Sequence, residues 1–127
     1  MGIGVDCVDI PSFERQLSDP ASHFATRCFT DRERGYSRRQ ARPAFHLAAR
    51  YAAKEAFIKA WSSQRFGKAP LLSSVDYQEI EVVKDRYGRP GLELHGKLKE
   101  SVGSHVAKIS LSHDGACAVA FVILQPT

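Results

Sequence analysis

The stretch from residue 44 to residue 61, AFHLAARYAAKEAFIKAW, decides how the rest of the chain can fold. It is rich in alanine and contains neither glycine nor proline, so its intrinsic preference is strongly helical. Leu47, Tyr51 and Ile58 fall on one side of such a helix. Four small side chains would let this helix approach a sheet closely: Ala49, Ala53, Ala56 and Ala60. The sequence therefore predicts one long central helix.

The segments before this helix predict a strand and shorter helices. Residues 2–10 (GIGVDCVDI) mix β-branched residues with two carboxylates, which is typical of a short strand. After Pro11, a helix that contains Phe13 is expected. Thr30 precedes Glu33 by three residues, which is the spacing of a capping box, so a further helix is predicted to begin there.

The C-terminal half predicts mainly strands. Residues 79–83 (EIEVV) and 91–95 (GLELH) flank a turn and predict a hairpin, and residues 97–103 favour a short helix. Residues 106–112 and 117–124 predict a final hairpin. Because the last segment (CAVAFVIL) is apolar throughout, we expect it to be buried on both faces. Helices in the first half and strands in the second indicate the α+β class.

The composition is that of a single domain spanning residues 1–127. Hydrophobic residues make up 43% of the chain and charged residues 25%, which excludes the compositions typical of disordered and fibrous proteins. No apolar run approaches the length of about 20 residues that a membrane-spanning helix requires, and no signal-peptide pattern is present. The three cysteines cannot build a disulfide framework or a CxxC zinc site. We therefore expect a cytoplasmic protein without membrane partners.

The formal net charge of +4 suits an anionic partner such as nucleic acid, a phosphorylated small molecule or an acidic protein. Much of this charge is concentrated in one stretch that contains Arg32, Arg34, Arg38, Arg39 and Arg42. One interpretation is a solvated helix face, and another is a surface that docks an acidic protein by electrostatic steering. A nucleic-acid-binding domain is a further alternative, but it would leave the carboxylates described next unexplained.

Asp6 and Glu55 are carboxylates in otherwise apolar surroundings. Asp6 stands between Val5 and Cys7 in the predicted strand, and Glu55 lies among alanines of the predicted helix. An unpaired ionised carboxylate in the interior would cost several kcal/mol, so each needs a cation. For Glu55 the simple partner is Lys59, one turn further on, in a surface pair worth about 0.3–0.5 kcal/mol. The alternative is that both carboxylates hold Mg²⁺, which needs only one or two carboxylates plus substrate phosphates.

Five motifs follow one another in an order that resembles the holo-acyl-carrier-protein synthases, the group I 4′-phosphopantetheinyl transferases. They are GIGVD at 2–6, FTxxE at 29–33, ARYAAKEAFIKAW at 49–61, YGRP at 87–90 and SLSHDGACAVAFVI at 110–123. The resemblance runs from Gly2 to Leu124, and the long helix is similar to that of actinobacterial members. It implies the small α+β fold of these transferases, with one long helix packed on a small antiparallel sheet, and a homotrimer with active sites between protomers.

The resemblance also implies an activity. A member of this family transfers 4′-phosphopantetheine from coenzyme A to a serine of an apo acyl carrier protein or carrier domain, which gives the holo form and 3′,5′-ADP and supports fatty acid or polyketide biosynthesis. Mg²⁺ is then the cofactor, coenzyme A the co-substrate and an acidic carrier the protein partner, with no role for nucleic acid. A catalytically inactive carrier-binding module is a further alternative, but it would have no use for a metal site.

The resemblance assigns roles residue by residue. Asp6 and Glu55 match the aspartate and glutamate that bind Mg²⁺ at the coenzyme A pyrophosphate, and Lys59 would stabilise the leaving 3′,5′-ADP. Glu33 matches the glutamate of FTxxE, which would either complete the metal shell through water or help deprotonate the serine. The residues expected to bind coenzyme A are Lys59, Arg50, Arg89, Pro90, Ser112 and His113, and Arg42 is expected near the carrier or the phosphates.

One departure from the family concerns carrier docking. Family members often carry a basic residue early in the helix after the first strand, and here Arg15 stands at a slightly shifted position. Carrier preference is therefore the property that the resemblance transfers least.

Overall fold

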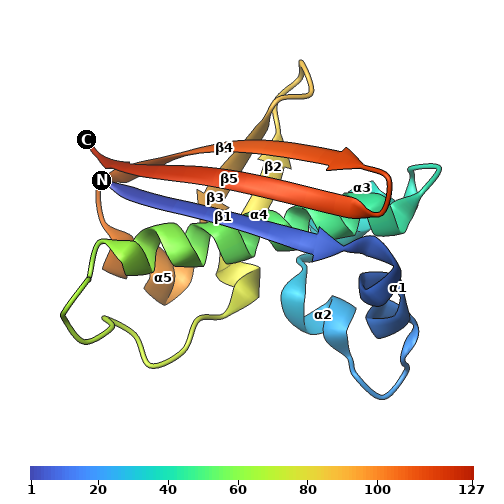
Figure 1. Cartoon of the computed structure of the whole chain (residues 1–127), viewed down its shortest axis with the longest axis horizontal. Helices are drawn as coiled ribbons and strands as arrows, with labels where there is room; N and C mark the ends of the chain where they lie inside the picture. The colour runs from blue at the N-terminus through green and yellow to red at the C-terminus, as the bar shows by residue number, and fades with distance from the viewer.

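The computed structural model describes residues 1–127 and has the predicted α+β architecture (Figure 1). Its larger sheet is antiparallel, with the strand order β1-β5-β4 formed by Gly2–Asp9, Cys117–Pro126 and His105–Asp114. Helix α4, Pro43–Ser63, packs along this sheet mainly against β1 and β5. The predicted central helix and final hairpin are confirmed, and both are slightly longer than the sequence indicated.

A second antiparallel hairpin lies beside the first sheet. It consists of β2, Ile80–Lys84, and β3, Pro90–Leu94, as predicted. The 3-10 turn η1, Tyr77–Glu79, precedes it, and helix α5, Gly96–Val102, follows it. The turn η1 and helix α5 contact each other.

Three short helices join β1 to α4: α1, Ile10–Ser18; α2, Phe24–Cys28; and α3, Asp31–Arg38. The capping box predicted at the start of α3 is present, with the Thr30 hydroxyl accepting from the Glu33 amide and the Glu33 carboxylate accepting from the Thr30 amide. An aromatic cluster with ring centroids 5.2–6.3 Å apart joins these helices to α4 and contains Phe13, Phe24, Phe29 and Tyr51.

Strand β1 lies directly on the backbone of α4 because two of its residues have no side chain. A Cβ atom added at Gly4 would lie 1.9 Å from the carbonyl oxygen of Ala56, and one added at Gly2 would lie 2.0 Å from that of Ala60. On the helix side, the alanines at this contact are fully buried. Glycine facing alanine is therefore what allows the strand and the helix to approach so closely.

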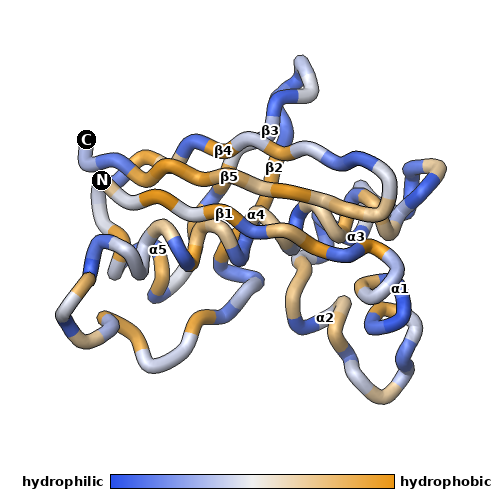
Figure 2. Tube along the Cα trace, viewed as in Figure 1, coloured by the Kyte–Doolittle hydropathy of each residue, from blue (hydrophilic) through white to orange (hydrophobic).

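The expectation that β5 is buried on both faces is wrong for the single chain. Only the face toward α4 is fully buried, and it carries Ala118, Ala120, Val122 and Leu124. On the other face no layer of helices covers the sheet, and Phe121 is 38% exposed. Its partner in register, Val5, and the neighbouring Ile3 are more than half exposed. The sheet thus carries an uncovered apolar face. Figure 2 shows that apolar residues run along both β1 and β5.

None of the helices is both long enough and apolar enough to cross a bilayer.

The close approach of β1 and α4 gives a direct stability prediction. Replacing Gly4 with alanine should destabilise the protein by about 3 kcal/mol or more, because the added Cβ would clash with helix backbone that cannot move aside cheaply. Urea unfolding measures the effect.

The matched control is Gly35→Ala in α3, where the nearest atom to the added Cβ is a flexible arginine terminus at 3.7 Å. That change should stabilise the protein by about 0.5–1 kcal/mol, because alanine is the better helix former. Equal stability of the two variants would contradict the proposed backbone contact.

Candidate active site

Three of the predicted site residues come together in one open cleft of about 470 Å³. Asp6 comes from β1, and Glu55 and Lys59 come from neighbouring turns of α4. The remaining wall is formed by the start of α1 and by Tyr51. The glycine–alanine contact between β1 and α4 explains why residues far apart in the sequence share this cleft.

Lys59 pairs with Asp6 and not with Glu55. Its Nζ atom donates to Asp6 Oδ1 at 3.1 Å and to the backbone oxygen of Val5 at 3.0 Å. The interpretation of Lys59 as an i,i+4 partner of Glu55 is therefore wrong. The lysine side chain is 56% exposed, so the ammonium group bridges the strand and the helix at the mouth of the cleft, where solvent can reach it.

Glu55 is held by a tyrosine that the sequence analysis did not single out. The Tyr77 hydroxyl donates to Glu55 Oε1 at 2.8 Å, and the Tyr77 ring stacks on Tyr51 with centroids 5.9 Å apart and planes 14° apart. Burial, together with the neighbouring Glu55 carboxylate, raises the pKa of both tyrosine hydroxyls above its ordinary value. The Tyr77 phenol therefore stays protonated at neutral pH and presents its hydrogen to the Glu55 carboxylate.

The carboxylates of this cleft fit a hard divalent cation. Glu55 Oε2 and Asp6 Oδ2 make no hydrogen bond within the protein, while the other oxygen of each carboxylate is fixed by one partner. Carboxylate oxygens in a solvent-open cleft are the ligands that Mg²⁺ uses, with water and substrate phosphates completing its shell. Asp6 and Glu55 are thus suited to the Mg²⁺ predicted for them.

A second group of predicted residues lines a separate cleft of about 230 Å³. It contains Arg50 of α4, Pro90 of β3, and Ser112 and His113 of β4. The two clefts share no lining residue. They also lie at opposite edges of the larger sheet, because β1 and β4 are its edge strands and β5 lies between them.

Arg50 is the unusual side chain of this second cleft. It is only 3% exposed, its guanidinium lies over the Tyr36 ring at 4.5 Å, and its Nε atom has no hydrogen-bond partner. Burial lowers the pKa of Arg50 and also that of the adjacent His46. A buried cation with an unpaired N–H is suited to binding an anionic group, since such a donor is costly to leave unsatisfied.

Two predicted residues lie outside both clefts. Arg89 is exposed on the turn between β2 and β3, where it pairs with Asp85 at 2.8 Å. Glu33 is 1% exposed, and three donors already occupy its carboxylate: the amides of Thr30 and Val82, and the ammonium group of Lys54. The structure therefore does not bring Glu33 together with Asp6 and Glu55.

Lys54, the partner of Glu33, was missed by the sequence analysis. It is fully buried, and its Nζ atom donates to Glu33 Oε1 at 2.8 Å and to the backbone oxygens of Cys28 and Tyr77 at 2.5 and 2.9 Å. Burial lowers its pKa from the ordinary value. A signal was present, because Leu47, Lys54 and Trp61 follow one another at seven-residue spacing and therefore share the inward face of α4.

The basic stretch divides into paired and free arginines. Arg32 donates to Glu81 and Glu93 at 2.7 Å each, and Arg34 pairs with Asp31. Burial alone would raise the pKa of Glu81, but hydrogen bonds from Arg32, Thr30 and His95 hold it at about 2. Arg32 thus already pairs with both carboxylates of the cluster formed by Glu81, Glu93 and His95. The arginines that remain exposed without an ion pair are Arg38, Arg39 and Arg42.

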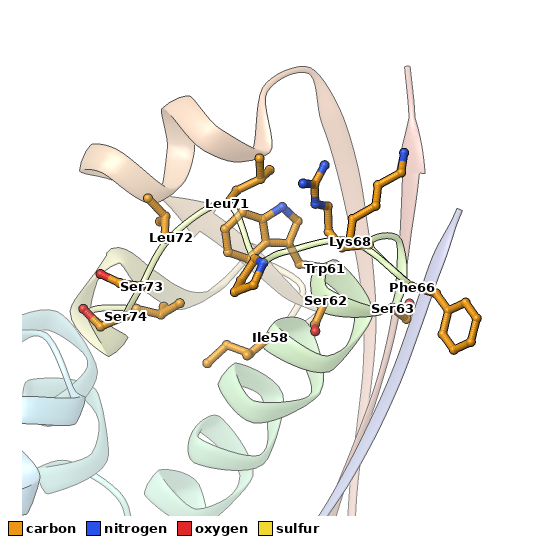
Figure 3. A pocket seen from close by; sticks show the side chains of 13 residues that line it. Ile58, Trp61, Ser62, Ser63, Phe66, Lys68, Leu71, Leu72, Ser73 and Ser74 are labelled. Carbon is orange, nitrogen blue, oxygen red and sulfur yellow. The ribbon is translucent and has the colours of Figure 1, made fainter.

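A larger apolar cavity of about 600 Å³ lies beyond the C-terminal part of α4 (Figure 3). Ile58 and Trp61 of the helix face Leu71 and Leu72 of the following loop across it, whereas the Phe66 ring points away into solvent and is 97% exposed. None of the predicted site residues lines this cavity.

Comparisons with known proteins match nearly the whole chain. Residues 2–120 match the family model described as the 4′-phosphopantetheinyl transferase superfamily. The chain is 42% identical over 125 residues to the holo-[acyl-carrier-protein] synthase of Mycobacterium tuberculosis and 41% identical to that of Mycobacterium ulcerans, covering 98% of this chain and 96% of each relative.

Solved structures agree with these matches. The ACPS–CoA complex of Chronobacterium ammoniagenes superimposes with a TM-score of 0.91 at 43% identity, covering 99% of this chain and 97% of that one. The acyl carrier protein synthase of Mycobacterium tuberculosis superimposes with a TM-score of 0.82 at 40% identity and the same coverage.

The buried Glu33–Lys54 pair gives a prediction about the stability of the fold. Replacing Lys54 with methionine should destabilise the protein by about 3–5 kcal/mol, because Glu33 would be left buried without its counter-charge. Thermal and urea unfolding measure the loss.

Lys99→Met in α5 is the control, since Lys99 is exposed and makes no ion pair. Its removal should change stability by less than about 0.5 kcal/mol. A Lys54 variant as stable as this control would contradict the account of the pair.

Proposed function

Because the chain belongs to the 4′-phosphopantetheinyl transferase superfamily, we propose that the cleft with Asp6, Glu55 and Lys59 carries out the reaction of that family. The enzyme transfers the 4′-phosphopantetheine group from coenzyme A to a serine of an apo acyl carrier protein, giving the holo form and 3′,5′-ADP. The observation that carries this proposal is the convergence of two carboxylates and one lysine in a single open cleft.

Asp6 and Glu55 would hold Mg²⁺ through their unoccupied oxygens. The metal would neutralise the charge of the coenzyme A pyrophosphate, which favours departure of 3′,5′-ADP. Each carboxylate is already fixed at its other oxygen, so little ordering is needed when the cation binds.

Lys59 supplies a mobile positive charge at the same place. It is half-exposed and held only by Asp6 and the Val5 carbonyl, so it can turn toward a phosphate that enters the cleft. An ammonium group at this position stabilises the charge that develops on the leaving phosphate. Glu33 receives no proton-transfer role in this mechanism, because three donors already occupy its carboxylate.

The second cleft is suited to the nucleotide end of coenzyme A. Arg50 and His113 offer donors to phosphate, and Pro90 and Phe45 offer apolar surface to a base. Arg89 would reach the nucleotide from the exposed hairpin turn. Since the two clefts lie at opposite edges of the sheet, one coenzyme A would contact the metal cleft of one protomer and the second cleft of its neighbour.

This arrangement requires further copies of the chain, and we propose a homotrimer. The uncovered face of the larger sheet supports it: Ile3, Val5 and Phe121 are exposed apolar side chains on adjacent strands. Contiguous exposed apolar surface of this kind is typical of a protein interface.

The carrier would dock on the exposed arginines. Arg38, Arg39 and Arg42 have no acidic partner in the chain, and an acidic carrier would supply one. Arg15 of α1 is a further exposed cation, beside the metal cleft. These charges would steer the encounter and position the carrier serine near Glu55.

Mass spectrometry of apo carriers tests the proposed function. Discrete carriers and carrier domains are incubated with coenzyme A, Mg²⁺ and the enzyme, and the serine should gain one phosphopantetheinyl group. Asp6→Asn and Glu55→Gln keep side-chain volume but remove a ligand charge, so each should abolish most turnover while the fold is retained. Either variant working at the wild-type rate in limiting Mg²⁺ would rule out the metal assignment.

Lys59 gives a prediction that separates catalysis from stability. Lys59→Ala should lower kcat on the order of 10²–10³-fold but change stability by less than about 1 kcal/mol, since the side chain is exposed. Lys59→Arg keeps the charge but changes its shape, so it should preserve stability and restore turnover only in part. A near-normal kcat for the alanine variant would leave Lys59 without a catalytic role.

The proposed docking of the carrier on Arg38, Arg39 and Arg42 predicts how KM depends on charge and ionic strength. Reversing Arg38 and Arg39 to glutamate should raise KM for the carrier and leave KM for coenzyme A nearly unchanged. Added salt should likewise raise the carrier KM of the wild type, because the Debye length is only about 8 Å at physiological ionic strength. Lys97→Glu with Lys99→Glu makes the same charge change on α5 and should leave the carrier KM unaltered. A carrier KM insensitive to salt would refute the steering.

A further inference from the structure

Two consecutive residues of α4 hold the same tyrosine at its two ends. Lys54 Nζ donates to the backbone oxygen of Tyr77 at 2.9 Å, and the Tyr77 hydroxyl donates to Glu55 Oε1 at 2.8 Å. Tyr77 therefore connects the fully buried Glu33–Lys54 pair to the carboxylate in the metal cleft.

The position of the Tyr77 hydroxyl is tightly determined. Its backbone begins the turn η1, which Asp76 caps by accepting from the Gln78 amide at 3.0 Å. Gln78 Nε2 also donates to the backbone oxygen of Phe29 at 3.2 Å, and the Tyr77 ring stacks on Tyr51. With both backbone and ring held, the hydroxyl oxygen is fixed in place, 2.8 Å from Glu55 Oε1.

Glu55 by itself would not be fixed. It lies on the side of α4 that faces an open cleft, it is only partly buried, and its Oε1 atom accepts a hydrogen bond from the Tyr77 hydroxyl. A flexible glutamate must lose rotamer freedom before it can ligate a cation. A donor that holds one oxygen removes part of that cost and leaves the other oxygen available.

From these contacts we infer that Tyr77 is a positioning residue for Glu55, and that the buried Glu33–Lys54 pair supports the metal cleft through it. The inference rests on the proposed function in that it takes Glu55 as a ligand of a divalent cation. It gives Glu33 a place in the site without contact to substrate: Glu33 fixes Lys54, Lys54 fixes the Tyr77 backbone, and Tyr77 fixes Glu55.

Binding of Mn²⁺ alone to the intact protein, followed by electron paramagnetic resonance, tests the inference without turnover. Tyr77→Phe keeps the stacked ring and removes only the donated hydrogen bond. We expect it to weaken Mn²⁺ binding about 10-fold or more, as loss of a residue that orients a metal ligand typically does. Its unfolding midpoint should stay close to that of the wild type, and the kcat lost in limiting Mg²⁺ should return in excess Mg²⁺.

The control is Tyr87→Phe, which removes a tyrosine hydroxyl bonded only to Arg86 on the exposed turn between β2 and β3. It should leave Mn²⁺ affinity unchanged. In a Glu55→Gln background, Tyr77→Phe should cause no further loss of affinity, because its effect acts through Glu55.

The outcomes distinguish the positioning role of Tyr77 from the metal assignment of the cleft. If Glu55→Gln weakens Mn²⁺ binding and Tyr77→Phe does not, the positioning role is overturned and the metal cleft stands. The positioning role is also overturned if Tyr77→Phe weakens binding equally with and without Glu55. If Glu55→Gln itself leaves Mn²⁺ affinity unchanged, the metal assignment of the proposed function fails, and the inference fails with it.

Discussion

The direct contact between the backbones of β1 and α4 is the constraint on which the rest of the structure depends. Gly2 and Gly4 face the carbonyl groups of Ala60 and Ala56 with no room for a side chain. At this distance Asp6, two residues beyond Gly4, comes within reach of Lys59 and shares a cleft with Glu55. The same packing that stabilises the domain therefore assembles the chemistry, and a bulkier residue at either glycine would disturb both.

A second interaction fixes the parts of the cleft that the close contact does not reach. The buried Glu33–Lys54 pair ties α3 to α4, and the hydrogen bond from the Val82 amide brings in β2. Lys54 also binds the backbone at Tyr77, where the long loop after α4 rejoins the folded domain. A buried ion pair stabilises little relative to apolar packing, but it defines one arrangement of the elements it joins. Here that arrangement is the one that directs a tyrosine to Glu55.

Features encoded locally were predictable from the sequence. The central helix, the capping box at Thr30 and both hairpins follow from helix propensity, periodicity and turn residues, and all are confirmed. The partner of Lys59 was not predictable, because Asp6 is distant in sequence and reaches it only through tertiary packing. The burial of β5 was overestimated for a related reason. The sequence of an apolar strand does not show whether a helix or another protomer covers its second face. The resemblance predicted site residues, but it could not indicate which of them share a cleft, because that depends on tertiary packing.

The central claim is that one active site combines the metal cleft of one protomer with the second cleft of another. Mixing two variants, Asp6→Asn and His113→Ala, by joint refolding tests it most directly, since each variant lacks a different half of the site. Each should be nearly inactive alone. The mixture should recover roughly one quarter of the wild-type rate, because about half of the protomers would contribute each intact surface. A mixture that stays as inactive as its components would contradict the claim.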